Sequence, residues 1–228
     1  MVTLFNMSQI AECNSLAGSQ AISLIVECME NSKENSALVT KLCVGTLCNF
    51  SNMPVFHEQI TNVAVVSIVN VLAAPSIHTS IKRDAIQIVY NLVNLYKVSK
   101  NDFISNGVIV ALWKTLKVQG GSGGAAASAS SMGDASTVAA TESIDESTAA
   151  AAAAAADDDG LSEEEASILI IGHVVKSLCD QACESGPMHK RVMADGVMHI
   201  LLKLSKIEMP ILKLDMSFAM YRCDRAFS

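Results

Sequence analysis

Apolar residues along the chain recur in blocks that join a short helical run to a longer one. One block runs from Asp102 to Leu112, and a matching block runs from Lys190 to Ile200. A looser copy runs from Glu58 to Ile68. Equivalent residues of the looser copy and the first block are 44 apart, and those of the two close copies are 88 apart, twice that distance. A fixed period of this length is typical of stacked helical repeats.

Each block predicts a short helix, a tight turn and a longer second helix. Gly107 and Gly196 stand at the turn, where a left-handed backbone disfavours any residue with a Cβ atom. Val63 takes that place in the looser copy, so we expect a different or strained turn there.

A third, long helix follows in each unit. It is apolar around most of its circumference, as expected when neighbouring units bury it from both sides. Ser162 and Glu165 have the spacing of a capping box and mark the start of one such helix, and Asn35 or Ser36 is the candidate N-cap of another. The four prolines fall between predicted helices, where proline is tolerated. The predicted third helices cover residues 36–50, 80–96 and 162–183, with a last one from about residue 210.

Residues 119–161 separate two repeat segments, which we place at residues 1–118 and 162–228. The separating segment is rich in Ala, Ser, Gly and Thr and has too little apolar mass to fold, so we predict a disordered insert. An acidic arm that is phosphorylated and competes for a binding surface is the alternative interpretation.

The composition fits stacked helices: 50% of the residues are hydrophobic but only 4% are aromatic. The formal charge is −7 because residues 119–160 hold seven of the 23 acidic residues and no Lys or Arg, which leaves the rest of the chain neutral. A basic footprint for nucleic acid is therefore not expected. The run from Val63 to Ala74 is too short to span a bilayer, and no signal peptide is evident, so we expect a cytoplasmic protein, or one that is nuclear or associated with the cytoskeleton.

The sequence offers few candidates for catalytic or metal-binding residues. The chain has seven cysteines, most of them inside apolar helical patterns, so we expect reduced, buried thiols. Cys179 and Cys183 share a helix face with His173 and His189 nearby, but they lack the close Cys-x-x-Cys pairs of structural zinc modules. No nucleophile elbow or phosphate loop is present. We therefore expect no enzyme, no cofactor and no metal site.

Several short motifs resemble the armadillo repeat. Ile104 to Ile109 reads Ile-Ser-Asn-Gly-Val-Ile, and Leu47 to Ser51 is similar to the Leu-x-Asn-Leu signature of the family's third helix. Tyr90-Asn91-Leu92 and Leu178-Cys179-Asp180 fall at matching places, and Cys223-Asp224 matches more weakly. The resemblance implies an all-α, right-handed α-solenoid of three-helix repeats. A unit of two helices, of the HEAT type, is the distant alternative, and the short helices before the two turn glycines argue against it.

The resemblance also implies a binding scaffold, because armadillo solenoids hold extended peptides or protein surfaces in a groove lined by third helices. Asn49 and Asn91 would bond the main chain of a peptide there, or else hold loop backbone of their own repeat. Asp180 and Asp224 would make the later groove acidic and favour basic partners. The tryptophans that form basic-residue pockets in the importin-alpha type are absent. The expected polar contacts at the groove come from Lys41, Gln87 and Lys176.

A second hypothesis is structural. The chain would be a segment of a larger ciliary or cytoskeletal solenoid, and it would act through end-to-end contact or self-association. This hypothesis rests on repeats whose ends expose apolar faces when nothing caps them.

Overall fold

The computed structural model describes residues 1–9, 20–31, 37–95, 100–119, 162–207 and 210–225. Every regular element in these ranges is a helix, which confirms the all-α prediction. The elements are α1 (Val2–Ser8), α3 (Gln20–Asn31), α4 (Ala37–Ser51), α5 (Pro54–Ala73), α6 (Thr79–Tyr90), the π-helical turn η2 (Asn91–Leu95), α7 (Lys100–Ser105), α8 (Val108–Gln119), α10 (Glu163–Cys183), α11 (Gly186–Ala194), α12 (Val197–Ser205) and α13 (Pro210–Arg225).

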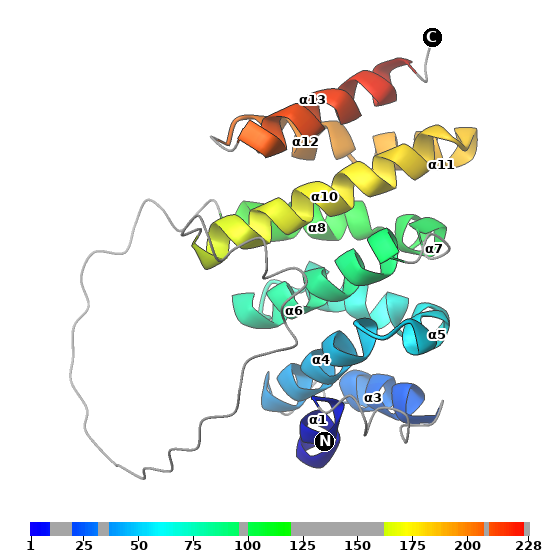
Figure 1. The fold of residues 1–228 in the computed structure, drawn as a ribbon, viewed down its shortest axis with the longest axis vertical. Helices are drawn as coiled ribbons and strands as arrows, with labels where there is room; N and C mark the ends of the chain where they lie inside the picture. The colour runs from blue at the N-terminus through cyan, green and yellow to red at the C-terminus, as the bar shows by residue number, and fades with distance from the viewer. Residues whose placement is uncertain (10–19, 32–36, 96–99, 120–161, 208–209, 226–228) are drawn as a thin grey trace, which may run out of the picture.

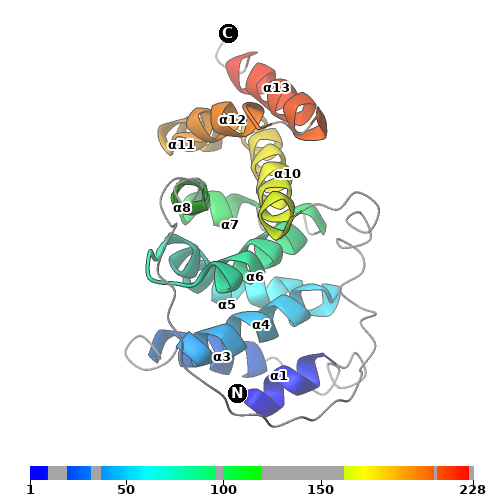
Figure 2. The same ribbon diagram turned by 90° about the vertical axis from the view of Figure 1, so that its left-hand side faces the viewer.

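The helices form two rows that run the length of the molecule (Figures 1 and 2). The front row consists of α1, α4, α6, α10 and α13, each packed on the next. The back row consists of α3, α5, α8 and α12, also packed in order. The short helices α7 and α11 contact each other at one side of the rows. The N-terminus lies at one end of the stack and the C-terminus at the other (Figure 1).

The predicted third helices correspond to the front row. α4, α6 with η2, α10 and α13 begin within one residue of the expected positions. The capping box at α10 forms as predicted: the Ser162 hydroxyl accepts from the Glu165 backbone N–H at 3.3 Å, and the Glu165 carboxylate accepts from the Ser162 N–H at 2.8 Å. The candidate caps Asn35 and Ser36 lie outside the described residues.

The turn glycines separate a short helix from the longer helix that follows it. Gly107 and Gly196 adopt positive φ angles of 80° and 85°, and the chain breaks there between α7 and α8 and between α11 and α12. At Val63 no turn forms, and α5 continues unbroken over 20 residues. The expectation of an altered turn is therefore wrong. A β-branched residue resists positive φ, so a single helix stands where the sequence predicted two.

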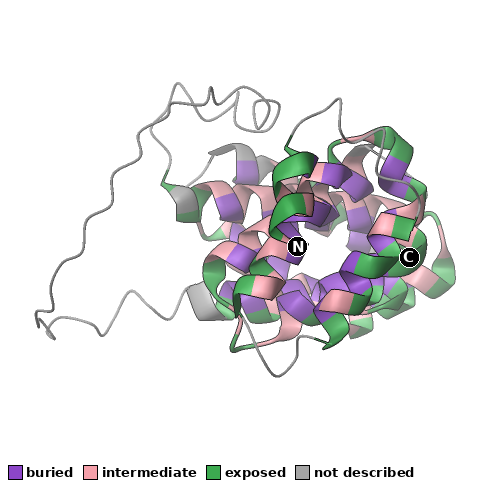
Figure 3. Ribbon diagram, turned by 90° about the horizontal axis from the view of Figure 1, so that it is seen from below, coloured by how far each residue is buried: buried purple, intermediate pink, exposed green. Residues whose placement is uncertain are grey.

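The core lies between the rows, and buried residues line the sides of the helices that face one another (Figure 3). Among the described helices, α5 and α10 are long and apolar enough to cross a membrane by length and composition alone. Their apolar windows are 56% and 44% buried inside the fold, so packing against neighbours accounts for much of that apolar character.

Two glycines within front-row helices allow close approach of the neighbouring helix. A Cβ atom at Gly45 of α4 would lie 2.8 Å from the ring of Phe5 in α1. A Cβ atom at Gly172 of α10 would overlap Leu212 of α13. The missing side chains therefore set the helix separation at two junctions of the front row.

The two predicted repeat segments pack against each other across the insert. α6 contacts α10 in the front row, and α8 contacts α12 in the back row. Lys203 of α12 donates to the Leu116 carbonyl of α8. Residues 120–161 lie outside the described part of the chain, and so does the disorder predicted for them.

Replacing Gly107 with Ala tests the role of the left-handed turn. No atom lies within 4 Å of a Cβ built there, so the substitution strains only the backbone, and we expect it to lower the free energy of unfolding by about 1 to 2 kcal/mol. Gly186→Ala is the matched control, because its Cβ also meets open space and its φ is not positive. Urea denaturation of both variants measures the difference, and equal stabilities would contradict the account.

Candidate interaction face along the front row

The two predicted groove asparagines bind the preceding helix of their own row. The Asn49 side-chain amide in α4 donates to the Ser8 hydroxyl of α1 at 2.9 Å. The Asn91 amide donates to the Ser51 hydroxyl of α4 at 2.8 Å. Both bonds cross from one unit to the next, an arrangement that neither interpretation of the sequence had anticipated.

The two serines are held alike. The Ser8 hydroxyl donates to the Phe5 carbonyl at 2.7 Å, and the Ser51 hydroxyl donates to the Cys48 carbonyl at 2.7 Å. Each hydroxyl thus keeps a lone pair directed at the asparagine of the next unit. The signal was present in the sequence, since Asn6-Met7-Ser8 recurs as Asn49-Phe50-Ser51 43 residues later.

The side-chain amide of Asn91 uses both of its N–H groups and its oxygen in hydrogen bonds. Its amide nitrogen also donates to the Asn52 side-chain oxygen at 2.8 Å, and its own oxygen accepts from Gln87 at 2.8 Å. The residue is 3% exposed. Because an amide nitrogen has two N–H groups and both are used, binding a peptide main chain through Asn91 would require breaking its bonds to Ser51 and Asn52.

The pattern changes at α10. Val93 stands where Ser8 and Ser51 stand in the earlier units and offers no hydroxyl. Asp180, the counterpart of Asn91, instead accepts from Arg222 of α13 at 2.7 Å. Its carboxylate charge is therefore balanced by a guanidinium within the fold.

A hollow of about 270 Å³ opens at the junction of α6 and α10. It contains two of the predicted groove residues, Lys176 and Asp180. Aromatic rings contribute as well, since Tyr90 and His173 meet edge to face with centroids 6.5 Å apart. The residues lining the hollow are Tyr90, Asn94, His173, Lys176, Ser177 and Asp180.

Asp215 of α13 lies beside the hollow and faces its basic side. Its carboxylate oxygens are 3.8 Å from the His173 Nδ1 atom and 3.8 Å from the Lys176 ammonium. All three side chains are partly exposed, so these contacts are weak. The hollow therefore offers donors and acceptors with nearly balanced charge.

The other predicted groove residues are spread along the row. Lys41 is exposed on α4 and lies near Asp84 of α6, where its charge acts against the burial that raises the pKa of the Asp84 carboxyl. Gln87 supports Asn91 as described above. Asp224 belongs to α13, but its side chain lies outside the described residues.

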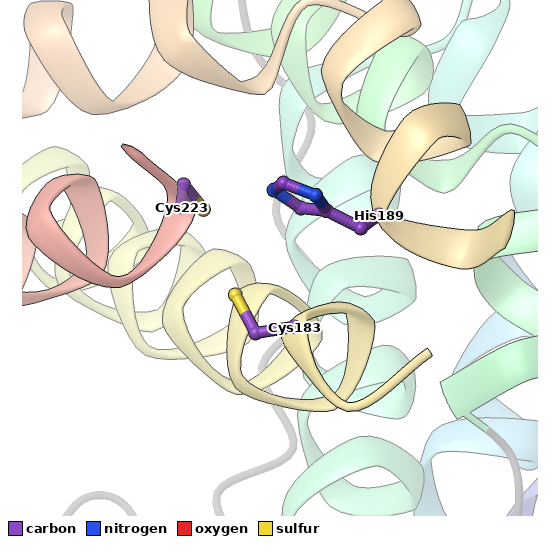
Figure 4. Close-up of side chains that lie close together, drawn as sticks. All are labelled: Cys183, His189 and Cys223. Atoms are coloured by element: carbon purple, nitrogen blue, oxygen red, sulfur yellow. The ribbon is translucent and has the colours of Figure 1, made fainter. Parts of the chain in front are cut away.

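A second group of side chains gathers at the far end of α10. The ligand-type atoms of Cys183, His189 and Cys223 all lie within 4.8 Å of one another (Figure 4). Cys179 is hydrogen-bonded to Cys223. His173, which sequence proximity had suggested as a neighbour, lines the hollow instead. Sequence spacing missed the cluster because Cys223 comes from a helix 40 residues further on than Cys183.

The described cysteines are free thiols with different acidities. Burial raises the pKa of Cys43 to about 11 and that of Cys48 to about 12. Burial likewise raises the pKa of Cys183 to about 11. Cys223 is the exception, since the hydrogen bond from Cys179 favours its thiolate and lowers its pKa to about 7.

Comparison of the chain with protein-family models, curated proteins and solved structures finds no match. The case for a repeat architecture therefore rests on the chain's own internal periodicity and on its packing.

Asn91→Ala tests the role of the asparagines between repeats. It removes three hydrogen bonds at a buried site, so we expect a loss of about 2 to 3 kcal/mol in the free energy of unfolding. Asn49→Ala removes one bond at a half-buried site and should cost about 1 kcal/mol. Urea denaturation measures both. An Asn91→Ala protein as stable as the parent would show that these bonds do not support the stack.

Proposed function

We propose that the chain is an armadillo-type α-solenoid that acts as a non-enzymatic protein-binding scaffold inside the cell. The observation that carries the proposal is the continuous front row. Each of its helices packs on the next, and a polar hollow lies on its surface between α6 and α10. Side-chain hydrogen bonds between adjacent units support the repeat character: Asn49 and Ser8 are 41 residues apart, and Arg222 and Asp180 are 42 apart.

The back row supports the same period. Thr115 of α8 donates to the Leu72 carbonyl of α5, 43 residues earlier. Lys203 of α12 donates to the Leu116 carbonyl of α8, 87 residues earlier, about twice that separation because the insert lies between. Successive units therefore repeat their contacts as well as their sequence, as expected of a solenoid.

The proposed partner is an extended peptide or a protein segment with an accessible main chain. The hollow offers donors and acceptors from Asn94 and Ser177 together with an aromatic wall from Tyr90. The sequence predicted a preference for basic partners that depended on Asp180 and Asp224. Because Asp180 is paired with Arg222, its carboxylate charge is already balanced within the fold. We therefore favour main-chain and polar recognition at the α6–α10 junction over capture of a strongly basic peptide.

Blocking the hollow tests this function. A peptide selected on the parent protein from a random library should bind Ser177→Arg at least about tenfold more weakly, because the larger side chain fills the hollow. Ser105→Arg, which makes the same change at an exposed site on α7, should bind as the parent does. Fluorescence polarisation measures both affinities, with circular dichroism confirming that each variant is folded. Equal binding by Ser177→Arg and the parent would sink the proposed site.

The alternative function is self-association within a larger assembly, and one observation favours it. Large apolar side chains are exposed on helices at both ends of the stack. Leu24 of α3 is 58% exposed, and Phe218 and Tyr221 of α13 are 54% and 57% exposed. Exposed apolar faces of this kind are covered by neighbouring repeats in longer solenoids.

Light scattering over a range of protein concentrations tests the alternative. If α13 mediates association, the parent should form oligomers that dissociate on dilution, and Phe218→Asp with Tyr221→Asp should be monomeric. Val66→Asp, which changes an exposed apolar residue of α5, is the control and should still associate. A parent protein that is monomeric at every concentration would rule the alternative out.

A further inference from the structure

Three helices bring Cys183, His189 and Cys223 together at the C-terminal end of the fold. Cys183 ends α10, His189 lies in α11 and Cys223 lies near the end of α13. Figure 4 shows the imidazole of His189 directed towards the two thiols. Their ligand-type atoms lie within 4.8 Å of one another, and His189 and Cys223 are buried.

The donor set and its spacing match one class of ligand. Thiolate sulfur and imidazole nitrogen are the preferred ligands of Zn²⁺, which binds sulfur at about 2.3 Å and nitrogen at about 2.0 to 2.1 Å. In a tetrahedral site these distances place neighbouring ligand atoms about 3.4 to 3.8 Å apart. The distances between the three ligand atoms, which are at most 4.8 Å, need to shorten by only about 1 Å to reach that geometry. We propose that Cys183, His189 and Cys223 form a structural Zn²⁺ site.

Cys179 is the fourth ligand. It lies one helical turn before Cys183 on the same face of α10 and is fully buried. Its thiol is hydrogen-bonded to Cys223, so it already lies at the edge of the cluster. A Cys₃His set completes the tetrahedron that structural zinc sites require.

The zinc site would stabilise the packing of α13 at the C-terminal end of the stack. α13 packs on α10 and α12, and the zinc would add coordinate bonds from α13 to both α10 and α11. Because a structural zinc binds the folded chain more tightly than the unfolded one, it contributes its binding free energy to stability. The inference is independent of the groove, since the hollow and the cysteine cluster share no residue.

Metal binding to the full-length protein tests the proposal. The protein is reduced with a phosphine, freed of metal with a chelator and then titrated with Zn²⁺ or Co²⁺. We expect one ion per chain in native mass spectrometry, a rise in melting temperature with Zn²⁺, and the intense visible bands of tetrahedral thiolate coordination with Co²⁺. A reduced protein that binds no zinc, or a cobalt spectrum typical of octahedral oxygen ligands, would overturn the proposal.

Ligand variants and one control variant test which residues form the site. Cys183→Ser removes a half-buried ligand and should weaken Zn²⁺ affinity at least about 100-fold, measured by competition with a fluorescent chelator. Cys28→Ser makes the same change at a half-buried cysteine of α3, outside the cluster, and should leave the affinity unchanged. If Cys183→Ser fails to fold, His189→Gln provides the second test with the same expected loss. Undiminished affinity in the folded ligand variants would refute the assignment.

Discussion

The architecture depends on the burial of each front-row helix between its two neighbours. α4, α6 and α10 contact a front-row helix on both sides as well as helices of the back row, so each of them buries residues on more than one face. Burial of apolar surface supplies most of the stabilisation, but it fixes neither register nor spacing. The glycines at positions 45 and 172 set the spacing where they admit Phe5 and Leu212, and polar pairs between adjacent helices set the register.

The asparagines therefore hold neighbouring helices in register, whereas the sequence suggested that they bind a peptide. Asn91 resembles a groove residue in sequence, but its buried amide joins the start of η2 to Ser51 and Asn52. A buried amide without partners costs about 1 to 3 kcal/mol, so such a group specifies one alignment and penalises others. At α10 the hydroxyl partner is replaced by Val93, and it is at this junction that the hollow opens. The hollow thus lies at the junction where the hydrogen bonds between neighbouring front-row helices differ from those at the earlier junctions.

Much of the fold follows from local sequence, and much of the site does not. The long helices, the capping box at Ser162 and the turns at Gly107 and Gly196 were predictable because each depends on a few neighbouring residues. The single long helix α5 was not predictable, because the absence of a glycine does not show whether the chain forms another kind of turn or continues as a helix. The hollow and the cysteine cluster combine residues from different units, such as Tyr90 with His173 and Cys183 with Cys223. Their assembly depends on tertiary packing, which periodicity alone cannot supply.

The described helices on both sides of the insert pack into one continuous stack. Trp113 is the chain's single tryptophan, and it reports on this junction from α8. Its ring centroid is 6.2 Å from that of His199 and 5.8 Å from the Lys203 ammonium, both in α12. Nuclear Overhauser spectroscopy of isotope-labelled protein should therefore show cross-peaks from the indole protons to the His199 and Lys203 side chains. A folded protein in which the indole shows contacts only within residues 1–118 would contradict the continuous stack.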